Sequence, residues 1–390
     1  MKIAVVCDSF KGSLTSKDAC AAVKDGLLRC NKNFEVLSLP FADGGEGTSR
    51  CFYDILGGQL RKAAVHDPLL REITAEYTVL PDGTDVIDIA SASGLTLLKS
   101  SERDAVKVSS LGSGELICDA AEHGAKHIIL GLGGSATTDA GTGILYALGM
   151  RFFSEDGVEV LPDGQNMIRV KKIRRTENFE RFKDIKFTLA CDVTNPLCGE
   201  NGAAYVFSPQ KGASKNDVKL LDNGLRNIGE IFEKASGKKI INLPGAGAAG
   251  GIGGGLSAFL NCELQSGFDV LARAASLEDK IRRSDAVITG EGKTDRQTLF
   301  GKLPKRVSDI AEKFGVPCIL LSGDVENDIS AEKLGVCEIH KIKEDGISLE
   351  HCMKNAALLL SERAFAIGKD SKIINKQYSR KQEKIRGNER

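Results

Sequence analysis

The sequence has 390 residues, 42% of them hydrophobic, and this length predicts two domains with substantial apolar cores. Its 53 Lys and Arg residues balance 53 Asp and Glu residues, so no net charge draws the chain to nucleic acid or to an anionic membrane. No apolar run approaches the roughly 18 residues that a membrane-spanning helix needs. A small molecule is therefore the expected partner.

The cysteines and histidines argue against a disulfide-bonded secreted protein and against a metalloprotein with histidine ligands. The 11 cysteines form neither CxxC pairs nor a compact disulfide framework, and residues 1–6 begin a strand rather than a signal peptide. The 5 histidines are scattered and include no HExxH motif, which argues against a histidine-ligated metal. We therefore expect a cytoplasmic protein with reduced thiols.

The first element is a short apolar run, residues 3–7, of the kind that predicts a buried parallel strand. It ends in the loop Asp-Ser-Phe-Lys-Gly-Ser of residues 8–13. Asp8 and Lys11 therefore follow the carboxyl end of a strand, where open α/β sheets bind ligands. The alternative is that Asp8 caps a turn and Lys11 is solvated.

A helix and a second strand come next. Thr15 and Asp18 resemble a capping box, and small or apolar residues recur at every fourth position as far as Leu27. Residues 34–39 repeat the strand pattern and lead into a second acidic loop, Pro-Phe-Ala-Asp-Gly-Gly-Glu-Gly-Thr, over residues 40–48. A short helix to Leu56 is expected after that loop.

From about Gln59 the pattern changes. Residues 73–80 and 85–89, separated by a Pro-Asp-Gly turn, predict an antiparallel hairpin. We place the crossover into a second domain within residues 66–70. The other elements expected in that domain are a helix around 115–123, strands at 151–153 and 187–191, and an amphipathic helix starting at Ser214 and ending before Gly237.

A glycine-rich loop at residues 131–143 belongs to the second domain. It follows the apolar run 127–130 and precedes a helix-like stretch to Leu148, which indicates strand, turn and helix. Glycines let the backbone approach a ligand closely, and the free amides of the following helix favour a phosphate or carboxylate. The sequence therefore predicts an anion-binding turn.

A second glycine-rich segment covers residues 244–255, which hold too much glycine to form a stable helix throughout. A low-complexity tether is one interpretation. Because apolar residues 256–260 follow directly, a loop that approaches a ligand or another backbone closely is the favoured one.

The last part of the chain returns to the α/β alternation of the first 60 residues. A buried strand at 286–289 leads into the loop Gly-Glu-Gly-Lys-Thr-Asp-Arg-Gln-Thr, and a helix at 304–314 and a strand at 318–322 follow. The predicted fold is α/β, with a discontinuous, doubly wound (Rossmann- or flavodoxin-like) domain of residues 1–68 and 286–368, an inserted α/β domain of mixed sheet at 69–285, and a basic, disordered tail at 369–390.

Three short motifs look like nucleotide-binding signatures, and each must be compared with the full pattern. Gly292-Lys293-Thr294 is not a Walker A motif, because Val287 stands where that motif needs glycine. Gly245-x-Gly247-x-x-Gly250 fits the dinucleotide fingerprint, but it follows a proline and lacks a second strand with an acid at its end. Gly131-x-Gly133-x-x-Ala136 follows a strand and has acids about 20 residues on, so an NAD-dependent dehydrogenase of a small hydroxy acid stays open as an alternative.

Five loops at strand ends combine glycine, carboxylate and hydroxyl groups, and none contains histidine: DSFK, ADGGEGT, GGSATTDAGTG, CDVTNP and GEGKTDRQT. Phosphoryl transfer depends on positioning and electrostatics, with amides and lysine for the phosphate oxygens and carboxylates for Mg²⁺ and the substrate hydroxyl. Of the reactions considered, phosphoryl transfer suits these five loops best.

The same loops, in this order along residues 1 to about 368, resemble the successive signatures of the bacterial glycerate kinase family. The resemblance implies ATP-dependent, Mg²⁺-assisted phosphorylation of D-glycerate, with 2-phosphoglycerate as the expected product. It also implies two α/β domains with the active site in the cleft between them. A sensor that binds a phosphorylated acid without turnover is a weaker alternative, and a homodimer is one assembly that the sequence leaves open.

The resemblance and the strand-end positions together give candidate roles. Lys11 is expected to contact a phosphate or the glycerate carboxylate. Asp8, Asp192 and Asp295 are catalytic candidates, and Asp43 and Asp192 are candidate Mg²⁺ ligands, although each aspartate has the alternative role of helix cap or turn former. The expected substrate- and phosphate-binding residues are Ser9, Asp43, Gly133, Gly134, Ser135, Thr137, Asn195, Gly250, Gly251, Glu291 and Gln297.

Overall fold

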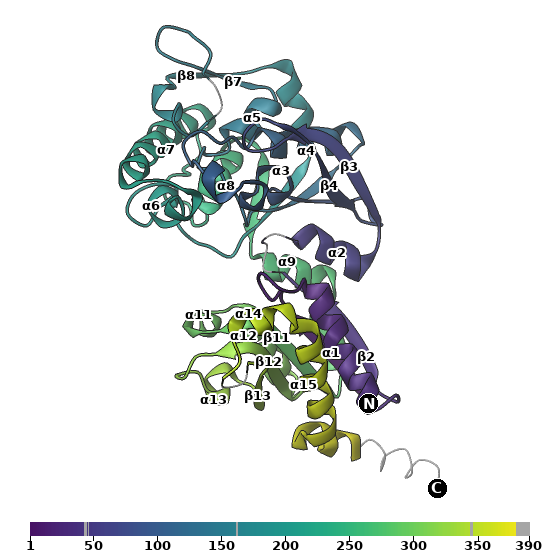
Figure 1. The fold of residues 1–390 in the computed structure, drawn as a ribbon. Helices are drawn as coiled ribbons and strands as arrows, with labels where there is room; N and C mark the ends of the chain where they lie inside the picture. Colours follow the sequence, from purple (N-terminus) through teal and green to yellow (C-terminus); the bar gives the residue numbers. More distant parts are fainter. Residues whose placement is uncertain (43–44, 46, 161–162, 344–345, 380–390) are drawn as a thin grey trace. The chain divides into compact units, whose positions relative to one another are not determined.

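The computed structural model describes residues 1–42, 45, 47–160, 163–343 and 346–379. The chain divides into two compact units: unit 1 comprises Met1–Asp43 with Leu271–Arg390, and unit 2 comprises Gly44–Val270. Figure 1 shows both as mixtures of helices and strands. Residues 44–68 thus fall in unit 2 and residues 271–285 in unit 1, whereas the sequence placed them the other way round.

Unit 1 is built on a parallel sheet with the strand order β13-β12-β11-β1-β2. Central strand β1 pairs with β2 on one side and with β11 on the other, so both ends of the chain build one sheet, as predicted. The strands are β1 (Lys2–Cys7), β2 (Glu35–Pro40), β11 (Ala286–Thr294), β12 (Cys318–Val325) and β13 (Glu338–Lys341).

Helices cover the sheet because its central strands are apolar on both faces. Ile3 and Val5 pack on one side with α1 and α15, two helices that lie side by side (Figure 1). α1 begins where predicted, since the Thr15 hydroxyl accepts a hydrogen bond from the Asp18 amide at 3.1 Å. The helices are α1 (Ser16–Cys30), α10 (Leu277–Arg282), α11 (Arg296–Leu299), α12 (Leu303–Lys313), α13 (Ala331–Leu334), α14 (Leu349–Lys354) and α15 (Ala356–Asp370).

The last helical segment corrects the prediction of a disordered tail from residue 369. α15 continues to Asp370, and residues 372–379 are helical. Ile374 is fully buried, and the Tyr378 ring meets Phe34 edge-on with centroids 5.8 Å apart. These two side chains hold the segment on unit 1, although it also carries Lys372 and Lys376. Residues 380–390 lie outside the described part of the chain.

Strand β11 is longer than predicted. It continues through Gly290-Glu291-Gly292-Lys293-Thr294, which the sequence placed in a loop. Parallel pairing with β12 accounts for this, since Glu291 lies opposite Ser322 and Lys293 opposite Asp324. A polar strand end held by its neighbour carries no apolar signal in the sequence.

Unit 2 has a mixed sheet with the order β10-β9-β6-β5-β4-β3. The predicted antiparallel hairpin is present as β4 and β5, and β3 adds an antiparallel edge strand that the sequence analysis did not specify. β7 and β8 form a separate two-stranded sheet. The strands are β3 (Gln59–His66), β4 (Glu72–Val79), β5 (Asp85–Asp88), β6 (His127–Gly131), β7 (Met150–Phe153), β8 (Lys172–Arg175), β9 (Lys186–Ala190) and β10 (Asn261–Gln265).

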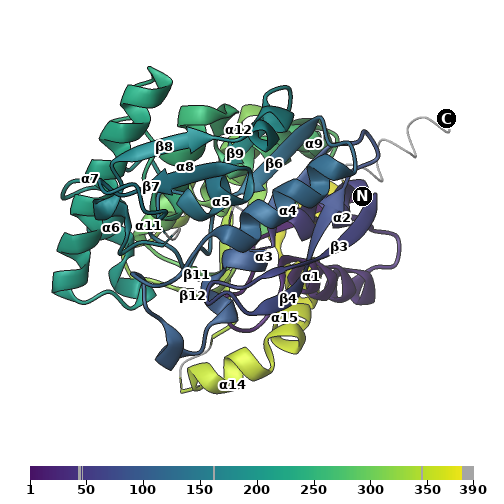
Figure 2. The same cartoon turned by 90° about the horizontal axis from the view of Figure 1, so that it is seen from above.

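The longest helix of unit 2, α7, begins as predicted with a capping box between Ser214 and Asp217, and its apolar face reaches Phe232 in the core. In Figures 1 and 2, α6 and α7 lie at one end of unit 2 and β3 at the other. The helices are α2 (Thr48–Leu56), α3 (Ala90–Ser93), α4 (Leu111–Glu122), α5 (Thr142–Ala147), α6 (Ala203–Phe207), α7 (Lys215–Ser236) and α8 (Ala248–Phe259), and α9 (Gly267–Ala274) spans the limit between the units.

All 11 cysteines lie within the described residues and are free thiols. The helices of the described chain include none with the length and apolar character needed to cross a membrane.

Candidate active site

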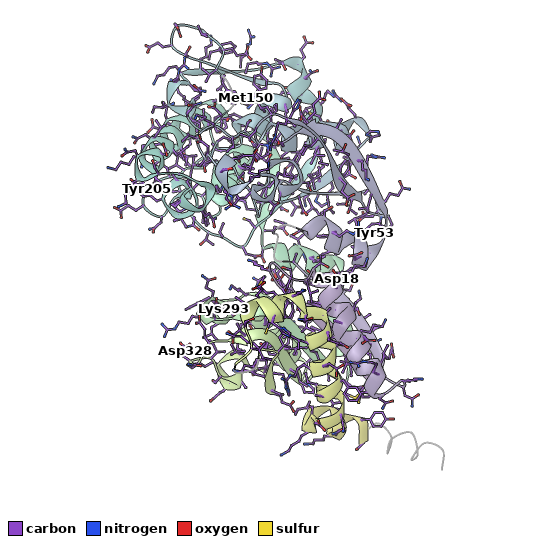
Figure 3. The ribbon with its side chains drawn as sticks, in the orientation of Figure 1. Asp18, Tyr53, Met150, Tyr205, Lys293 and Asp328 are labelled. Carbon is purple, nitrogen blue, oxygen red and sulfur yellow. The ribbon has the colours of Figure 1, made fainter. Side chains whose placement is uncertain are left out.

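A pocket of about 660 Å³ lies in unit 1 at the carboxyl ends of β1, β11 and β12. β1 and β11 are the strands at which the connections of this sheet change direction, and open α/β sheets bind ligands beside that point. Figure 3 labels Lys293 in this part of unit 1. The lining residues are Asp8, Ser9, Phe10, Lys11, Ser13, Glu291, Gly292, Lys293, Asp295, Lys302, Gly323, Asp324, Ile342, Lys343, Leu349, Cys352, Met353 and Ala356. We call this cavity the unit 1 pocket.

Five residues predicted from the sequence line the unit 1 pocket together: Asp8, Ser9, Lys11, Glu291 and Asp295. They come from opposite ends of the chain and meet because β1 and β11 are neighbours. The Asp8 amide donates to the Gly290 carbonyl at 2.9 Å, which ties the two loops at their start.

The loop after β1 is a tight turn that presents Lys11 to solvent. The Ser9 amide donates to Asp8 Oδ1 at 2.6 Å, and Gly12 has a positive φ of 78°. Lys11 makes no ion pair with the described residues, so its ammonium charge is available to an anion. A flexible, compact cation of this kind suits a phosphate or carboxylate.

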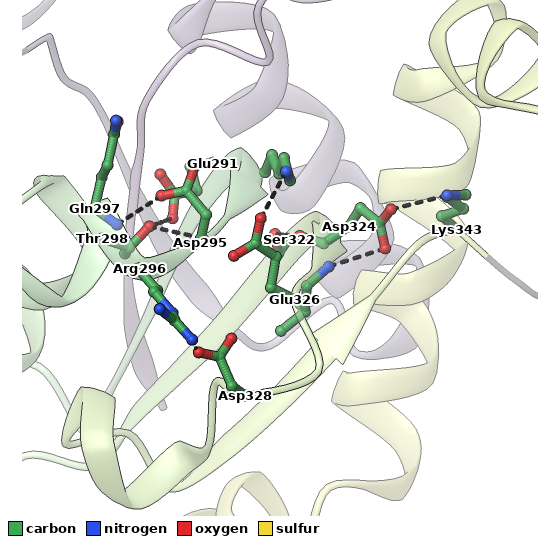
Figure 4. Close-up of polar contacts among 12 residues, drawn as sticks. Glu291, Asp295, Arg296, Gln297, Thr298, Ser322, Asp324, Glu326, Asp328 and Lys343 are labelled. Atoms are coloured by element: carbon green, nitrogen blue, oxygen red, sulfur yellow. Dashed lines mark hydrogen bonds and ion pairs between the residues drawn. The ribbon is translucent and has the colours of Figure 1, made fainter.

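Glu291 is a buried carboxyl group at the base of the pocket, 5% exposed. Thr298 Oγ1 donates to Glu291 Oε1 at 2.7 Å (Figure 4). Burial raises the pKa of Glu291 to about 7, and the hydrogen bonds from Thr298 and Thr294 offset only part of that effect. Glu291 therefore exchanges a proton near neutral pH.

Asp295 both caps a helix and faces the pocket. Its Oδ1 accepts the Gln297 amide at 2.9 Å at the start of α11, so the alternative role of helix cap is realised. Burial alone would raise its pKa, but Lys302 Nζ at 3.3 Å and the amide hydrogen bonds outweigh burial and lower the pKa. Asp295 is thus ionised at neutral pH. Gln297 contributes this amide but does not line the pocket.

Four charged residues of the pocket were not among the predicted site residues: Lys293, Lys302, Asp324 and Lys343. Lys343 Nζ lies 2.9 Å from Asp324 Oδ2 and lowers the pKa of that carboxyl group (Figure 4). Asp324 follows a glycine near the end of a strand, so the rule that identified the other loops would have found it. Lys302 and Lys343 carry no such signal, because their positions depend on long-range packing.

In unit 2, the sequence predicted an anion site at the start of α5, and amides there already have partners within the protein. Asp139 Oδ1 accepts from Gly141 at 3.0 Å, and Ser110 Oγ accepts from Ile144 at 3.1 Å. Asp139 is fully buried, and burial raises its pKa despite these hydrogen bonds. The carboxylate of the chain itself takes the place that the sequence assigned to a ligand.

Earlier in that loop the predicted residues remain accessible only in part. Gly133 is half-buried and Gly134 exposed, whereas Ser135 and Thr137 are buried. Ser135 Oγ accepts the Thr137 amide at 3.0 Å. Their predicted contact with phosphate stays a prediction.

The segment 245–255 approaches backbone closely, as predicted, but the backbone belongs to the loop 131–143. Ala249, Gly250 and Gly251 adopt left-handed conformations before the helix proper begins. A Cβ atom at Gly250 would collide with the Thr137 carbonyl, and the Ala140 amide donates to the Gly250 carbonyl at 3.0 Å. Packing therefore explains these glycines, and binding of a ligand by Gly250 and Gly251 stays a prediction.

Lys211 is a buried residue of unit 2 that the sequence analysis missed. It is 3% exposed, and its Nζ donates to the Thr137 carbonyl at 2.6 Å. Burial lowers its pKa to about 8. A lysine inside an apolar core gives no sequence signal that separates it from a solvated one.

The remaining predicted residues follow β9 or lie outside the described chain. Asp192 is exposed directly after the strand. The Asn195 side chain donates to the Asn201 carbonyl at 2.8 Å, which holds its own loop together. Asp43 lies outside the described residues.

Among the described residues, no group of three or more His, Cys, Asp or Glu side chains is placed to hold a metal ion. Kinase sites hold Mg²⁺ with one or two carboxylates, substrate phosphates and water, so such a group is not required. Asp8 and Asp295 line one pocket and fit that pattern.

The alternative of an NAD-dependent dehydrogenase is not supported by the strand pairing. A dinucleotide fingerprint needs a second strand parallel to the first, with an acid at its end. β7, which precedes Glu155 and Asp156, pairs antiparallel with β8 and lies outside the sheet that contains β6.

A doubly wound sheet with lysines and carboxylates at its switch point is an arrangement suited to phosphoryl transfer, and comparisons with known proteins agree that this is a kinase. The model of the glycerate kinase family matches residues 3–372. The chain is 41% identical over 330 residues to glycerate 2-kinase of Escherichia coli K12, covering 84% of this chain and 87% of that protein. It is 38% identical over 364 residues to a glycerate kinase of Halalkalibacterium halodurans, covering 93% and 96%.

A crystal structure from Salmonella typhimurium LT2, assigned as glycerate kinase 2, superposes with a TM-score of 0.83. It is 34% identical in sequence, and the match covers 95% of this chain and 97% of the other. The chain belongs to the glycerate kinase family.

Proposed function

We propose that this protein is a cytoplasmic enzyme that transfers the γ-phosphoryl group of ATP to D-glycerate and forms 2-phosphoglycerate. The observation that carries the proposal is the unit 1 pocket, where a lysine without an ion-pair partner in the described chain stands beside ionisable carboxyl groups. The name of the Escherichia coli relative supports the 2-hydroxyl as the acceptor.

In the reaction, the glycerate hydroxyl oxygen forms a bond to the γ-phosphorus while the bond from that phosphorus to the β,γ-bridging oxygen breaks. The hydroxyl proton passes to a carboxylate, for which Asp192 and Asp295 are the candidates. Lys11 holds an anionic oxygen of a substrate. Mg²⁺, which would neutralise phosphate charge, would be held by one or two carboxylates; Asp8 and Asp295 of the unit 1 pocket fit that role, and the ligands expected from the sequence, Asp43 and Asp192, stay predictions.

The test is a coupled assay of ADP release with ATP, Mg²⁺ and D-glycerate, with ³¹P NMR to assign the product. Asp192→Asn should reduce kcat by a factor on the order of 100, within the range that a positioned acid-base group contributes. Asp184→Asn is the matched control, because Asp184 is also exposed but precedes β9 instead of following it.

Unchanged turnover in Asp192→Asn would remove Asp192 from the mechanism. Wild-type protein that releases no ADP with D-glycerate or with related hydroxy acids would contradict the proposed function itself.

A further inference from the structure

We infer, on the basis of the proposed function, that the apolar half of the unit 1 pocket binds the nucleobase of ATP. At about 660 Å³ the pocket falls in the range that suits ligands of drug or nucleotide size, several times larger than a three-carbon acid. Glycerate alone would leave most of its wall uncovered. A nucleotide matches both its volume and its division into a charged and an apolar part.

The apolar half is formed by five side chains from the segment after β13 and from helices α14 and α15. Ile342, Cys352 and Ala356 are buried at 4, 5 and 3% exposure. Leu349 and Met353 of α14 line the same wall but are 60 and 36% exposed. When a flat, apolar ring covers apolar side chains at the edge of a cavity, their surface is removed from water, and this stabilises the bound state.

α14 lies against the loop that carries Lys11. The Ser348 hydroxyl caps the helix by accepting the His351 amide at 3.2 Å. Met353 lies over Gly12, where its Cε would stand 2.8 Å from an added Cβ atom. We call the surface formed by Leu349 and Met353 the α14 wall. A nucleobase on this wall is next to the turn of residues 8–12, so the phosphates of the same nucleotide have Lys11 within reach.

The charged half of the pocket is compatible with the phosphates of the same ligand. Lys302 and Lys343 face Asp295 and Asp324 at 3.3 and 2.9 Å, so these two ammonium groups are shared with carboxylates. Lys11 carries the charge with no such partner among the described residues. The nucleotide thus has a stacking surface at one end and an anion site at the other, without a glycine-rich Walker loop.

Binding of ADP, measured by isothermal titration calorimetry, tests the inference on the full-length protein. Leu349→Asp places a charge on the wall and should raise the Kd for ADP at least about tenfold, the cost of losing one leucine contact. The KM of this variant for D-glycerate should stay within about twofold of the wild-type value, because the substitution does not change the contacts that bind glycerate.

Leu358→Asp is the matched control. Leu358 is 61% exposed on the neighbouring helix α15, almost as much as Leu349, but it does not line the unit 1 pocket. Both constants should be unchanged in this variant. Met353→Ala, which removes apolar surface without adding charge, should raise the Kd for ADP by a smaller factor and covers the case in which Leu349→Asp fails to fold.

An unchanged Kd for ADP in both wall variants would overturn the inference, as would a change confined to the KM for D-glycerate. These failures differ from a failure of the proposed function. Wild-type protein that binds ADP on the α14 wall but does not phosphorylate glycerate would retain the inference and refute the substrate.

Discussion

The loops at the strand ends look alike in the two units, but they do different things. In unit 1, the turn after β1 and the end of β11 open onto a pocket, and their charged side chains face it. In unit 2, the loop 131–143 and the segment 245–255 lock into each other through the Thr137 carbonyl and the Ala140 amide. Glycine, hydroxyl and carboxylate groups at a strand end therefore indicate a close approach, but not whether a ligand or another backbone arrives.

Buried carboxyl groups show the same contrast. Asp139 of unit 2 is surrounded by amides and a hydroxyl of its own unit and serves as internal structure. Glu291 of unit 1 has a threonine partner on one side and the pocket on the other. The hydrogen bonds of Asp139 stabilise the fold, whereas Glu291 remains available for a proton or a ligand.

The largest expected effect is in unit 2. Gly250→Ala combines a positive φ of 70° with a collision against the Thr137 carbonyl, and should lower the free energy of unfolding by about 3–5 kcal/mol. Urea denaturation measures this loss. Gly157→Ala is the control, because Gly157 has a φ of 81° but open space around it, and should cost about 1–2 kcal/mol.

Equal losses in the two glycine variants would break the comparison between the units. The interlock of the two loops would then contribute nothing beyond the backbone conformation of one residue.

A smaller effect is expected from Glu291→Gln. Burial raises the pKa of Glu291 from its ordinary value of 4.5 to about 7. Between these two pH values the native state keeps a proton on Glu291 that the unfolded state has already released. Deprotonation of Glu291 therefore lowers the free energy of unfolding by about 3 kcal/mol in total as pH rises from about 5 to 7. The positive charge of Lys302 offsets part of the rise in pKa, and the negative charge of Asp8 adds to it.

Urea denaturation at pH 5, 6, 7 and 8 compares the wild type with Glu291→Gln, and the wild type should lose stability relative to the variant across that window. Parallel pH profiles would mean that Glu291 is as satisfied as Asp139, and the contrast between the two carboxyl groups would disappear.

The smallest effect concerns Lys11→Ala, which should reduce kcat/KM about 30-fold, equivalent to about 2 kcal/mol of lost charge-assisted binding. The melting temperature should not change, because Lys11 is exposed and has no ion-pair partner in the described chain. Lys24→Ala, an exposed lysine on α1, is the matched control. A loss of stability without a loss of activity would assign Lys11 to structure, like the loops of unit 2.

Local signals in the sequence were sufficient for much of the fold. The hydroxyl caps at Thr15 and Ser214 set the starts of α1 and α7, and continuous apolar runs marked β1 and β6. These features depend on neighbours within a few residues. The parallel sheet of unit 1 followed from them, because its two halves repeat the same alternation.

Other features depend on partners that are distant in the sequence. The polar end of β11 is a strand only because β12 lies beside it, and Gly250 is required only because Thr137 passes within contact distance. Lys302 reaches Asp295 across a helix end that periodicity does not position. The lining of the candidate site was therefore predicted at the ends of β1 and β11, and was missed at the end of β12 and at the lysines that packing brings in.

The discontinuity of unit 1 has a consequence for synthesis of the chain. The Lys2 amide bonds to Asp285, 283 positions later, and β1 finds its second neighbour only in β11. On the ribosome, the first 43 residues emerge long before the strands that complete their sheet, whereas unit 2 is continuous and emerges whole. We therefore expect a nascent chain to fold its middle first, and a truncated product that ends before β11 to keep unit 2 but lack the switch-point pocket.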